Sequence, residues 1–361
     1  MEALSRAREH SAESPILELR GLTMHFPIGG GFFGRATGAV RAVDGVDLTV
    51  QDGEALGIVG ETGCGKTTLG RCIVRAYDPT GGQMLYRQHG GAVVDAATLG
   101  KNELKSYRRE VRVIFQDPYA SLNPRMTLLQ IVGEPLKVHG IATGKELEER
   151  VAELLRKVGL RPEYIRRYPH AFSGGERQRI SIARALSLGP RLVVADEAVS
   201  ALDVSVRAQI LNLLEDLQAE GALTYLLITH DLSVVDYLCN RVAVMYLGRI
   251  VELAPTQSAY EDPQHPYTEA LLSAIPIPDP RERNRRQRIK SSGELPDPSK
   301  QIAGCPFHTR CAYARDVCAT ETPLLRPVKS GHWAACHFSE ELSLEGVGAT
   351  GGTTGAVPAI R

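Results

Sequence analysis

A glycine-rich loop that ends in lysine and threonine is the first candidate for chemistry in this sequence. It covers residues 60–68 and fits the pattern G-x-x-x-x-G-K-[ST]. In such a loop the backbone N–H groups face the β-phosphate of a nucleotide, lysine reaches the β- and γ-phosphates, and the first threonine offers its hydroxyl to Mg²⁺. We interpret the cysteine in the loop as a small loop residue. The residues predicted to bind a nucleoside triphosphate are Gly60, Glu61, Thr62, Gly63, Cys64, Gly65, Lys66, Thr67 and Thr68.

Two carboxylates follow the apolar residues 192–195 further along the chain. Neighbouring residues of a strand point to opposite sides, so one carboxylate can face a metal while the other faces the attacking water. We assign Asp196 to Mg²⁺, together with Thr67, and Glu197 to the role of general base. Gln116 follows the strand-like residues 111–115, where its amide would reach both Mg²⁺ and the water. His230 follows another apolar run and could sense the γ-phosphate.

A second element that could bind phosphate lies between the loop and the acidic pair. Residues 172–179 read Phe-Ser-Gly-Gly-Glu-Arg-Gln-Arg, so two glycines open a predicted helix. Free backbone N–H groups and the positive end of the helix dipole make this turn an anion site. The sequence of this turn alone does not identify whose phosphate it binds.

Short apolar runs indicate the elements that position these residues. Residues 55–59, 191–195 and 223–228 are β-branched and barely alternate, as in parallel strands buried on both faces, and a helical segment follows each. This rhythm predicts a doubly wound α/β core with its ligands at the carboxyl ends of the strands. Residues 83–97 alternate around two glycines like a hairpin, and residues 146–158 have helical apolar spacing. We therefore expect an antiparallel β layer and a helical subdomain.

Composition limits the classes of function. Lysine plus arginine and aspartate plus glutamate both number 42 in 361 residues, so no excess of positive charge indicates a nucleic-acid partner. No apolar run approaches the roughly 18 to 20 residues of a membrane span, and the first 13 residues are polar, so we expect a cytosolic chain. Residues 1–15 and 343–361 are expected to lack fixed structure, and the proline-rich stretch with the basic residues 281–290 is read as a linker.

Four of the seven cysteines fall in one compact segment with the spacing C-x₅-C-x₆-C-x₁₇-C. In a reducing compartment such a cluster indicates metal rather than disulfides. Zinc and an iron–sulfur cluster both suit four thiolates, and uncoordinated thiols remain an alternative. The residues concerned are Cys305, Cys311, Cys318 and Cys336, with His308, His332 and His337 as substitute ligands.

In their order along the chain, these motifs resemble the nucleotide-binding subunit of ATP-binding cassette (ABC) transporters. The resemblance covers roughly residues 16–260. It implies an α/β P-loop NTPase core with a mostly parallel sheet, an antiparallel β subdomain, and a helical signature subdomain at about residues 118–190. In that family two subunits meet head to tail, so the glycine-led helix would hold the γ-phosphate of ATP bound to its partner. The residues expected to act in trans are Ser173, Gly174, Gly175, Glu176 and Asp203.

The same resemblance implies further roles and shows two departures. Gln116 would transmit the nucleotide state to a membrane subunit, and Phe26, or less well His25, would stack on adenine. Glu176 stands where the family usually has glutamine, and Ala198 stands where a proline often follows the two acids. Neither change removes a phosphate ligand, so we expect a site competent for hydrolysis.

The tail resembles the C-terminal extension of oligopeptide and dipeptide permease ATPases, through residues 262–274, 292–296 and 304–311. Residues 116–127 and 199–205 resemble the F-type subunit, which implies a D-type ATPase partner, two membrane permease subunits and an extracytoplasmic binding protein at the inner membrane. The four tail cysteines are similar to those that bind a [4Fe–4S] cluster in this group, so the resemblance implies that role for them. The extension is expected at residues 261–342. Alternatives are nickel or glutathione uptake, a soluble ABC ATPase of a nucleic-acid machine, and a regulator without enzymatic activity.

Overall fold

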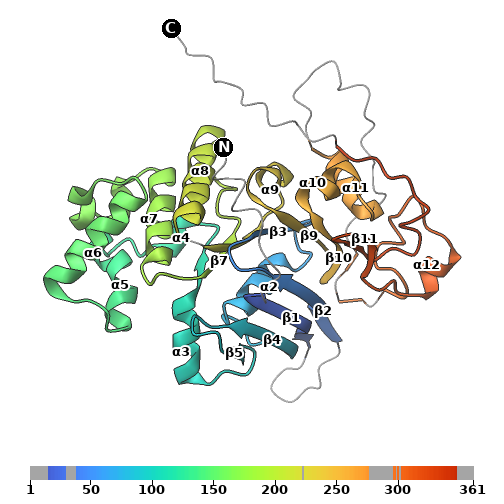
Figure 1. The fold of residues 1–361 in the computed structure, drawn as a ribbon, viewed down its shortest axis with the longest axis horizontal. Coiled ribbons are helices and arrows are strands. Elements are labelled where there is room, and N and C mark those ends of the chain that lie inside the picture. Colours follow the sequence, from blue (N-terminus) through green and yellow to red (C-terminus); the bar gives the residue numbers. More distant parts are fainter. Residues whose placement is uncertain are drawn as a thin grey trace, which may run out of the picture. The chain divides into compact units, whose positions relative to one another are not determined.

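The computed structural model describes residues 15–29, 38–221, 223–275, 296–297, 299–300 and 302–347 (Figure 1). The chain divides into two compact units. The first comprises Met1–Met24, Gly45–Leu56 and Thr67–Thr229, and the second comprises His25–Asp44, Gly57–Lys66 and His230–Arg361. The predicted linker at residues 281–290, most of the first 15 residues and residues 348–361 lie outside the described part.

Parallel strands form the centre of the first unit. β6 (Val111–Ile114) pairs with β7 (Leu192–Asp196), which pairs with β8 (Thr224–Ile228), and both pairs are parallel. Every residue of β7 and β8 is buried, which explains why their sequences are apolar without alternation. A further strand, β3 (Ala55–Val59), divides its residues between the two units and leads into the glycine-rich loop. All four strands were expected from the sequence to within about one residue at their ends.

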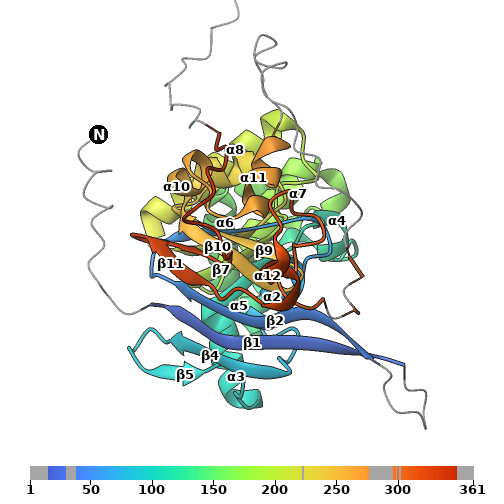
Figure 2. The ribbon, with the colours of Figure 1, turned by 90° about the vertical axis from the view of Figure 1, so that its right-hand side faces the viewer.

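Antiparallel strands form a separate sheet in the order β2-β1-β4-β5. Its strands are β1 (Leu17–Ile28), β2 (Gly38–Val50), β4 (Gly81–Arg87) and β5 (Val93–Asp95), seen edge to edge in Figure 2. The predicted hairpin is confirmed, because β4 pairs antiparallel with β5. Gly91 takes a positive φ of 83° in its turn, a conformation that glycine adopts without strain. α3 (Lys101–Glu110) follows β5.

Helices fill the segment between β6 and β7. They are α4 (Pro118–Ser121), α5 (Leu128–Val138), α6 (Gly144–Lys157), two short 3₁₀ turns (Pro162–Arg166 and Pro169–Ala171) and α7 (Gly174–Leu186). In α6 the buried residues Leu147, Val151 and Leu155 recur every fourth position, which is the apolar spacing that predicted this helix. α2 (Lys66–Ile73) follows the glycine-rich loop, and α8 (Val204–Gly221) follows β7.

The second unit is built around antiparallel strands. β9 (Arg241–Tyr246) pairs with β10 (Arg249–Pro255), β10 pairs with β12 (His332–Ala334), and β12 pairs with β11 (Arg326–Lys329). The helices of this unit are α9 (Leu232–Leu238), α10 (Thr256–Glu261), α11 (Pro266–Ser273) and α12 (Asp316–Thr320). The expectation of a mostly parallel sheet therefore describes the first unit, whereas the C-terminal extension adds two antiparallel strands beside β10.

A buried carboxylate joins the extension to β10. Glu252 is fully buried and accepts hydrogen bonds from the backbone N–H of Gln264, at 2.7 Å, and from the Thr268 hydroxyl. It also lies 2.7 Å from Nε2 of the buried His332. Such a network satisfies a carboxylate that would otherwise be costly to bury. In the part of the chain that the structure describes, no helix has both the length and the apolar character needed to cross a membrane.

Candidate active site

Residues 60–66 of the glycine-rich loop lie in the second unit, and two of the loop's glycines are required sterically. Gly60 and Gly65 have φ values of 154° and 107°. A Cβ on Gly60 would lie 2.2 Å from the Met245 carbonyl oxygen, and one on Gly65 would lie 1.9 Å from the Ala42 carbonyl oxygen. Any larger residue would therefore collide with backbone as well as adopt a strained φ. These two motif positions shape the loop as the sequence predicted.

Lys66 is 4% exposed and folds back over the loop. Its Nζ donates to the carbonyl oxygens of Gly60, at 2.7 Å, and Glu61, at 2.9 Å. Cys64 is buried beneath it, with Sγ 3.7 Å from Nζ, and burial raises the pKa of its thiol. A neutral, buried thiol agrees with the interpretation of Cys64 as a packing residue of the loop.

Thr67 and Asp196 meet in the first unit. The Thr67 hydroxyl donates to Oδ1 of Asp196 at 3.0 Å. Asp196 ends β7 and is 7% exposed, so its carboxylate is held at the carboxyl end of a buried strand. A hydroxyl and a carboxylate in contact supply the oxygen ligands that Mg²⁺ uses beside nucleotide phosphates. The two residues predicted to hold the metal are therefore brought together.

Glu197 adopts a left-handed backbone conformation, with φ +47°. Several hydrogen bonds hold this strained residue. Its N–H donates to the Ile228 carbonyl at 2.8 Å, and its carbonyl accepts from the N–H and hydroxyl of Ser200, at 3.1 and 2.9 Å. Its Oε2 accepts from Nε2 of the exposed Gln116 at 2.7 Å. A strained backbone that several hydrogen bonds hold in place is typical of functional sites. Here these bonds fix the backbone position from which the Glu197 side chain extends.

The glycine-led helix α7 begins with a capping box. Ser173 is its N-cap and accepts from the Glu176 N–H at 3.4 Å, while the Glu176 carboxylate accepts from the N–H and hydroxyl of Ser173, at 2.9 and 2.8 Å. Glutamate performs this capping role as glutamine does, so the departure at Glu176 keeps the helix start intact. A Cβ on Gly175 would lie 2.4 Å from Cγ1 of Val206 in α8, whereas one on Gly174 would make only an ordinary contact. Asp203 precedes α8, and its backbone carbonyl accepts from the Arg207 N–H at 2.8 Å.

The remaining predicted residues of the nucleotide site lie in the second unit. His230 is exposed and follows β8 by two residues. Phe26 is partly buried in β1, and its stacking on adenine stays a prediction. Nε2 of His25 lies 3.0 Å from Oδ1 of Asp44, so the weaker candidate for stacking has a polar partner.

The four tail cysteines lie near one another in the second unit and form no disulfide with any described cysteine. Cys305 and Cys318 are buried, Cys311 and Cys336 partly so, and the Cys305 N–H donates to the Cys318 carbonyl at 2.8 Å. Burial raises the pKa of Cys305 to about 12 and that of Cys311 to about 11. Among the described residues, no group of three His, Cys, Asp or Glu side chains could hold a metal ion. The predicted metal centre is therefore not supported as a single-ion site.

Two residues that sequence reasoning missed bind the loop from the C-terminal region. Arg310 contacts the Glu61 carboxylate with both terminal nitrogens, at 2.9 and 3.0 Å. The Glu61 N–H donates to the Tyr267 hydroxyl at 2.8 Å. Glu61 occupies an unspecified position of the loop pattern and Arg310 lies 249 residues away, so no spacing signal could have connected them.

Comparison with known families matches both parts of the chain. Residues 43–200 match the model of the ABC transporter family, and residues 251–318 match the oligopeptide/dipeptide transporter C-terminal region. The oligopeptide transport ATP-binding protein AppF of Bacillus subtilis is 51% identical over 327 residues, which cover 90% of this chain and 98% of AppF. The chain belongs to the ABC transporter ATP-binding proteins.

A further relative and a solved structure support the same family for this ABC protein. The probable peptide ABC transporter ATP-binding protein y4tS of Sinorhizobium fredii is 51% identical and covers 89% of each chain. A solved dimeric structure of the ATP-binding cassette MJ0796, bound to ADP and phosphate after hydrolysis, is 28% identical with a TM-score of 0.58, over 66% of this chain and 98% of MJ0796. The P-loop α/β fold and an ATPase site using ATP with Mg²⁺ are therefore confirmed.

Proposed function

We propose that this chain is the ATP-hydrolysing subunit of an importer for dipeptides or oligopeptides. The observation that carries the ATPase part is the arrangement at the carboxyl ends of β6 and β7, where Thr67 meets Asp196 and Gln116 holds Glu197. The names of the peptide-import relatives support the class of substrate.

Each residue of the site would have a separate role in ATP hydrolysis. Thr67 and Asp196 would hold Mg²⁺, which neutralises charge on the phosphates, and Lys66 would leave the loop carbonyls for the β- and γ-phosphates. Glu197 would take a proton from water as the water oxygen attacks the γ-phosphorus. The bond from phosphorus to the β-phosphate bridging oxygen breaks, so ADP and phosphate leave. His230 would contact the γ-phosphate.

The start of α7 would complete the ATP site of a second ATPase subunit, which we infer to be a D-type homologue. The backbone N–H groups at the start of α7 would form an anion site, and the cassette MJ0796 was solved as a dimer. Gly174→Ala should abolish hydrolysis in the assembled pair while leaving ATP affinity at this chain's own loop nearly unchanged, because the added methyl meets no close neighbour within the chain. An equal loss of affinity at that loop would show that α7 acts in cis.

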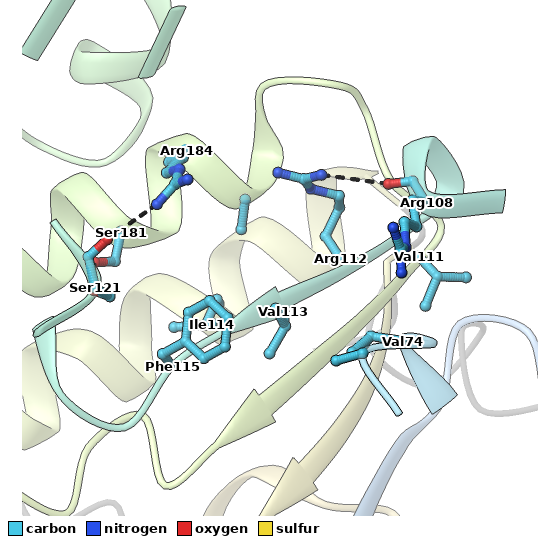
Figure 3. A pocket seen from close by; sticks show the side chains of 12 residues that line it. Val74, Arg108, Val111, Arg112, Val113, Ile114, Phe115, Ser121, Ser181 and Arg184 are labelled. Carbon is cyan, nitrogen blue, oxygen red and sulfur yellow. Dashed lines mark hydrogen bonds between the residues drawn. The ribbon is translucent and has the colours of Figure 1, made fainter. Parts of the chain in front are cut away.

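A pocket beside Gln116 supports docking of a membrane permease subunit on the first unit (Figure 3). It has a volume of about 200 Å³ and is lined by Ile114, Phe115 and the two arginines Arg112 and Arg184. Phe115 is 44% exposed and precedes Gln116 directly. A permease segment with an apolar side chain and a carboxylate would match this lining, and its contact with Phe115 would reach the residue that holds Glu197. Two permease subunits and an extracytoplasmic binding protein would complete the importer, with this chain at the cytoplasmic face of the inner membrane.

The four cysteines would hold a [4Fe–4S] cluster. Four cysteines lie in this extension, where the Cys305 N–H donates to the Cys318 carbonyl, and four thiolates are the ligand set that such a cluster uses. When bound, it would cross-link the proline-rich tail. Anaerobic purification followed by iron, sulfide and zinc assays tests this assignment: stoichiometric zinc without iron would reject it.

Transport by the assembled protein tests the proposed function. The chain would be purified with its partner subunits, reconstituted in liposomes with the binding protein, and supplied with radiolabelled dipeptide, oligopeptide, nickel or glutathione. ATP-dependent peptide accumulation that Glu197→Gln abolishes is expected. Accumulation of nickel or glutathione alone would replace peptide as the substrate. ATPase activity that nucleic acid stimulates without any membrane partner would overturn the transporter function.

A further inference from the structure

Hydrogen bonds hold Glu61 of the phosphate loop at its carboxylate, its backbone N–H and its backbone carbonyl. Its carboxylate accepts two hydrogen bonds from Arg310, its N–H donates to Tyr267, and its carbonyl accepts from Lys66 at 2.9 Å. Arg310 and Tyr267 belong to the C-terminal region, whereas Lys66 is the residue that must reach the phosphates of ATP. One loop residue thus connects the C-terminal region to the phosphate-binding lysine.

Arg310 is itself fixed by its surroundings. It is 8% exposed, and the bond to Glu61 raises the pKa of its guanidinium above the ordinary value. One terminal nitrogen lies 3.4 Å from the Tyr246 hydroxyl, and the Arg310 N–H donates to the Phe307 carbonyl at 2.9 Å. The rings of Tyr246, Tyr267 and Phe307 pack against one another, with centroids 4.6 to 5.3 Å apart. The guanidinium therefore contacts Glu61 beside this cluster of packed rings, 5.9 Å from the centroids of Tyr246 and Phe307.

We propose that Arg310 is a positioning residue of the ATP site, through which the C-terminal region holds the phosphate loop ready for ATP. Two effects give it this role. A bidentate arginine–carboxylate pair fixes direction as well as distance, so the Glu61 backbone is held beside Lys66. The guanidinium also neutralises a carboxylate inside a loop that must receive a triphosphate. Without Arg310 this carboxylate would repel ATP.

This inference rests on the ATPase function proposed above, and ATP affinity tests it directly. The full-length chain and its variants Arg310→Gln, Arg310→Lys, Glu61→Gln and the double variant Arg310→Gln/Glu61→Gln would be titrated with a fluorescent ATP analogue. Arg310→Gln should weaken binding about tenfold, the effect of leaving a charged group unpaired. Arg310→Lys should recover part of the affinity, because it restores the charge without the bidentate geometry.

The double variant separates positioning from a general loss of structure. Glu61→Gln removes the repelling charge, so it should raise ATP affinity more in the Arg310→Gln variant than in the unaltered chain, a non-additivity expected of residues in contact. Arg315→Gln is the matched control, because Arg315 makes a 2.8 Å ion pair with Glu341 in the same region but is half exposed. It should bind ATP as the unaltered chain does.

Each result decides between the alternatives. If Arg310→Gln lowers the thermal midpoint but binds ATP with unchanged affinity, or if the two single changes simply add, Arg310 serves stability only and the inference is wrong. In the assembled ATPase the KM for ATP should rise more than kcat falls. An unaltered chain that binds no ATP would overturn the ATPase function and this inference together, whereas unchanged variants of a chain that binds ATP would overturn only the inference.

Discussion

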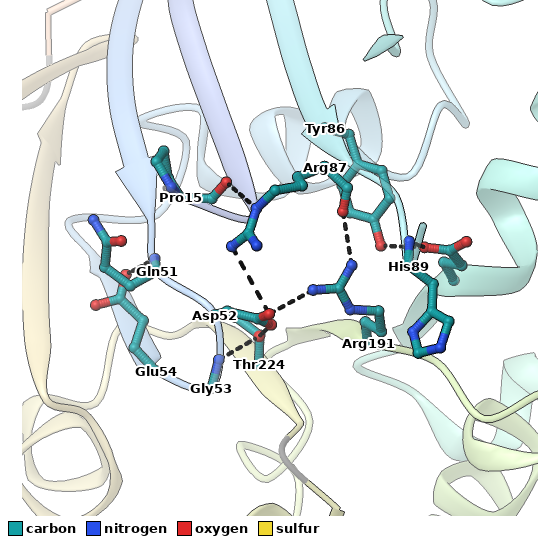
Figure 4. A network of polar contacts seen from close by, with 11 residues as sticks. Pro15, Gln51, Asp52, Gly53, Glu54, Tyr86, Arg87, His89, Arg191 and Thr224 are labelled. Atoms are coloured by element: carbon teal, nitrogen blue, oxygen red, sulfur yellow. Dashed lines mark hydrogen bonds and ion pairs between the residues drawn. The ribbon is translucent and has the colours of Figure 1, made fainter. Parts of the chain in front are cut away.

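The two ends of the parallel strands in the first unit differ in how their charged groups are satisfied. At the amino ends, Asp52 accepts from Arg191, at 2.5 Å, and from the hydroxyl of Thr224, at 3.4 Å, and lies 3.9 Å from Arg87 (Figure 4). At the carboxyl ends, the Asp196 and Glu197 carboxylates accept from the neutral groups of Thr67 and Gln116. Arginine side chains compensate the carboxylate at the first end, and a hydroxyl and an amide donate to those at the second.

The network at the amino ends joins segments that are distant in the chain. Arg191 donates to the Arg87 carbonyl at 2.8 Å, and Arg87 donates to the Pro15 carbonyl at 3.3 Å. The N–H of Gly53 donates to the Thr224 hydroxyl at 2.9 Å. These bonds connect the starts of β7 and β8 with the antiparallel sheet. The amino ends therefore serve stability, whereas the opposite ends carry the strained Glu197 that we propose as the general base.

Glu197→Gln should have the largest effect and should lower catalysis while leaving stability nearly unchanged. Removal of the general base should lower kcat by about 10² to 10⁴-fold, because the amide cannot take a proton from the attacking water. ATP binding should persist, and the thermal midpoint should change little because glutamine can still accept from Gln116. Steady-state ATPase kinetics of the assembled protein and a thermal melt measure the two quantities. Turnover close to that of the unaltered protein would show that another group removes the proton.

Asp52→Ala should have the opposite profile. It leaves Arg191 and Thr224 without their shared acceptor at a partly buried site, which should lower the free energy of unfolding by about 1 to 2 kcal/mol. The kcat for ATP should stay within about twofold of that of the unaltered protein, since the change lies at the far ends of the strands. Urea unfolding and ATPase assays together check it. A large loss of kcat in a folded Asp52→Ala protein would mean that the two ends are coupled.

The sequence predicted one of these ends far better than the other. The catalytic end was predictable because phosphate chemistry restricts residue types at fixed spacing, as in the loop at residues 60–68 and the pair Asp196–Glu197. The pairing of Asp52 with Arg191, 139 residues apart, follows no local pattern. The positive φ of Glu197 also escaped prediction, because the bond from its N–H to the distant Ile228 carbonyl helps to hold it. The contact between Arg310 and Glu61 was hidden for the same reason.

Tyr86→Phe should give the smallest effect and shows whether single bonds at the amino ends matter. The buried Tyr86 hydroxyl donates to Oε2 of Glu110 at 3.0 Å, and the same oxygen accepts from the His89 N–H at 3.1 Å. Phenylalanine keeps the edge-to-face packing on Tyr107, and Glu110 retains the His89 bond. The free energy of unfolding should therefore fall by only about 0.5 to 1.5 kcal/mol, and ATPase activity should not change. A loss larger than that of Asp52→Ala would show that this network acts as one cooperative unit, in which removal of one hydroxyl costs more than removal of the central carboxylate.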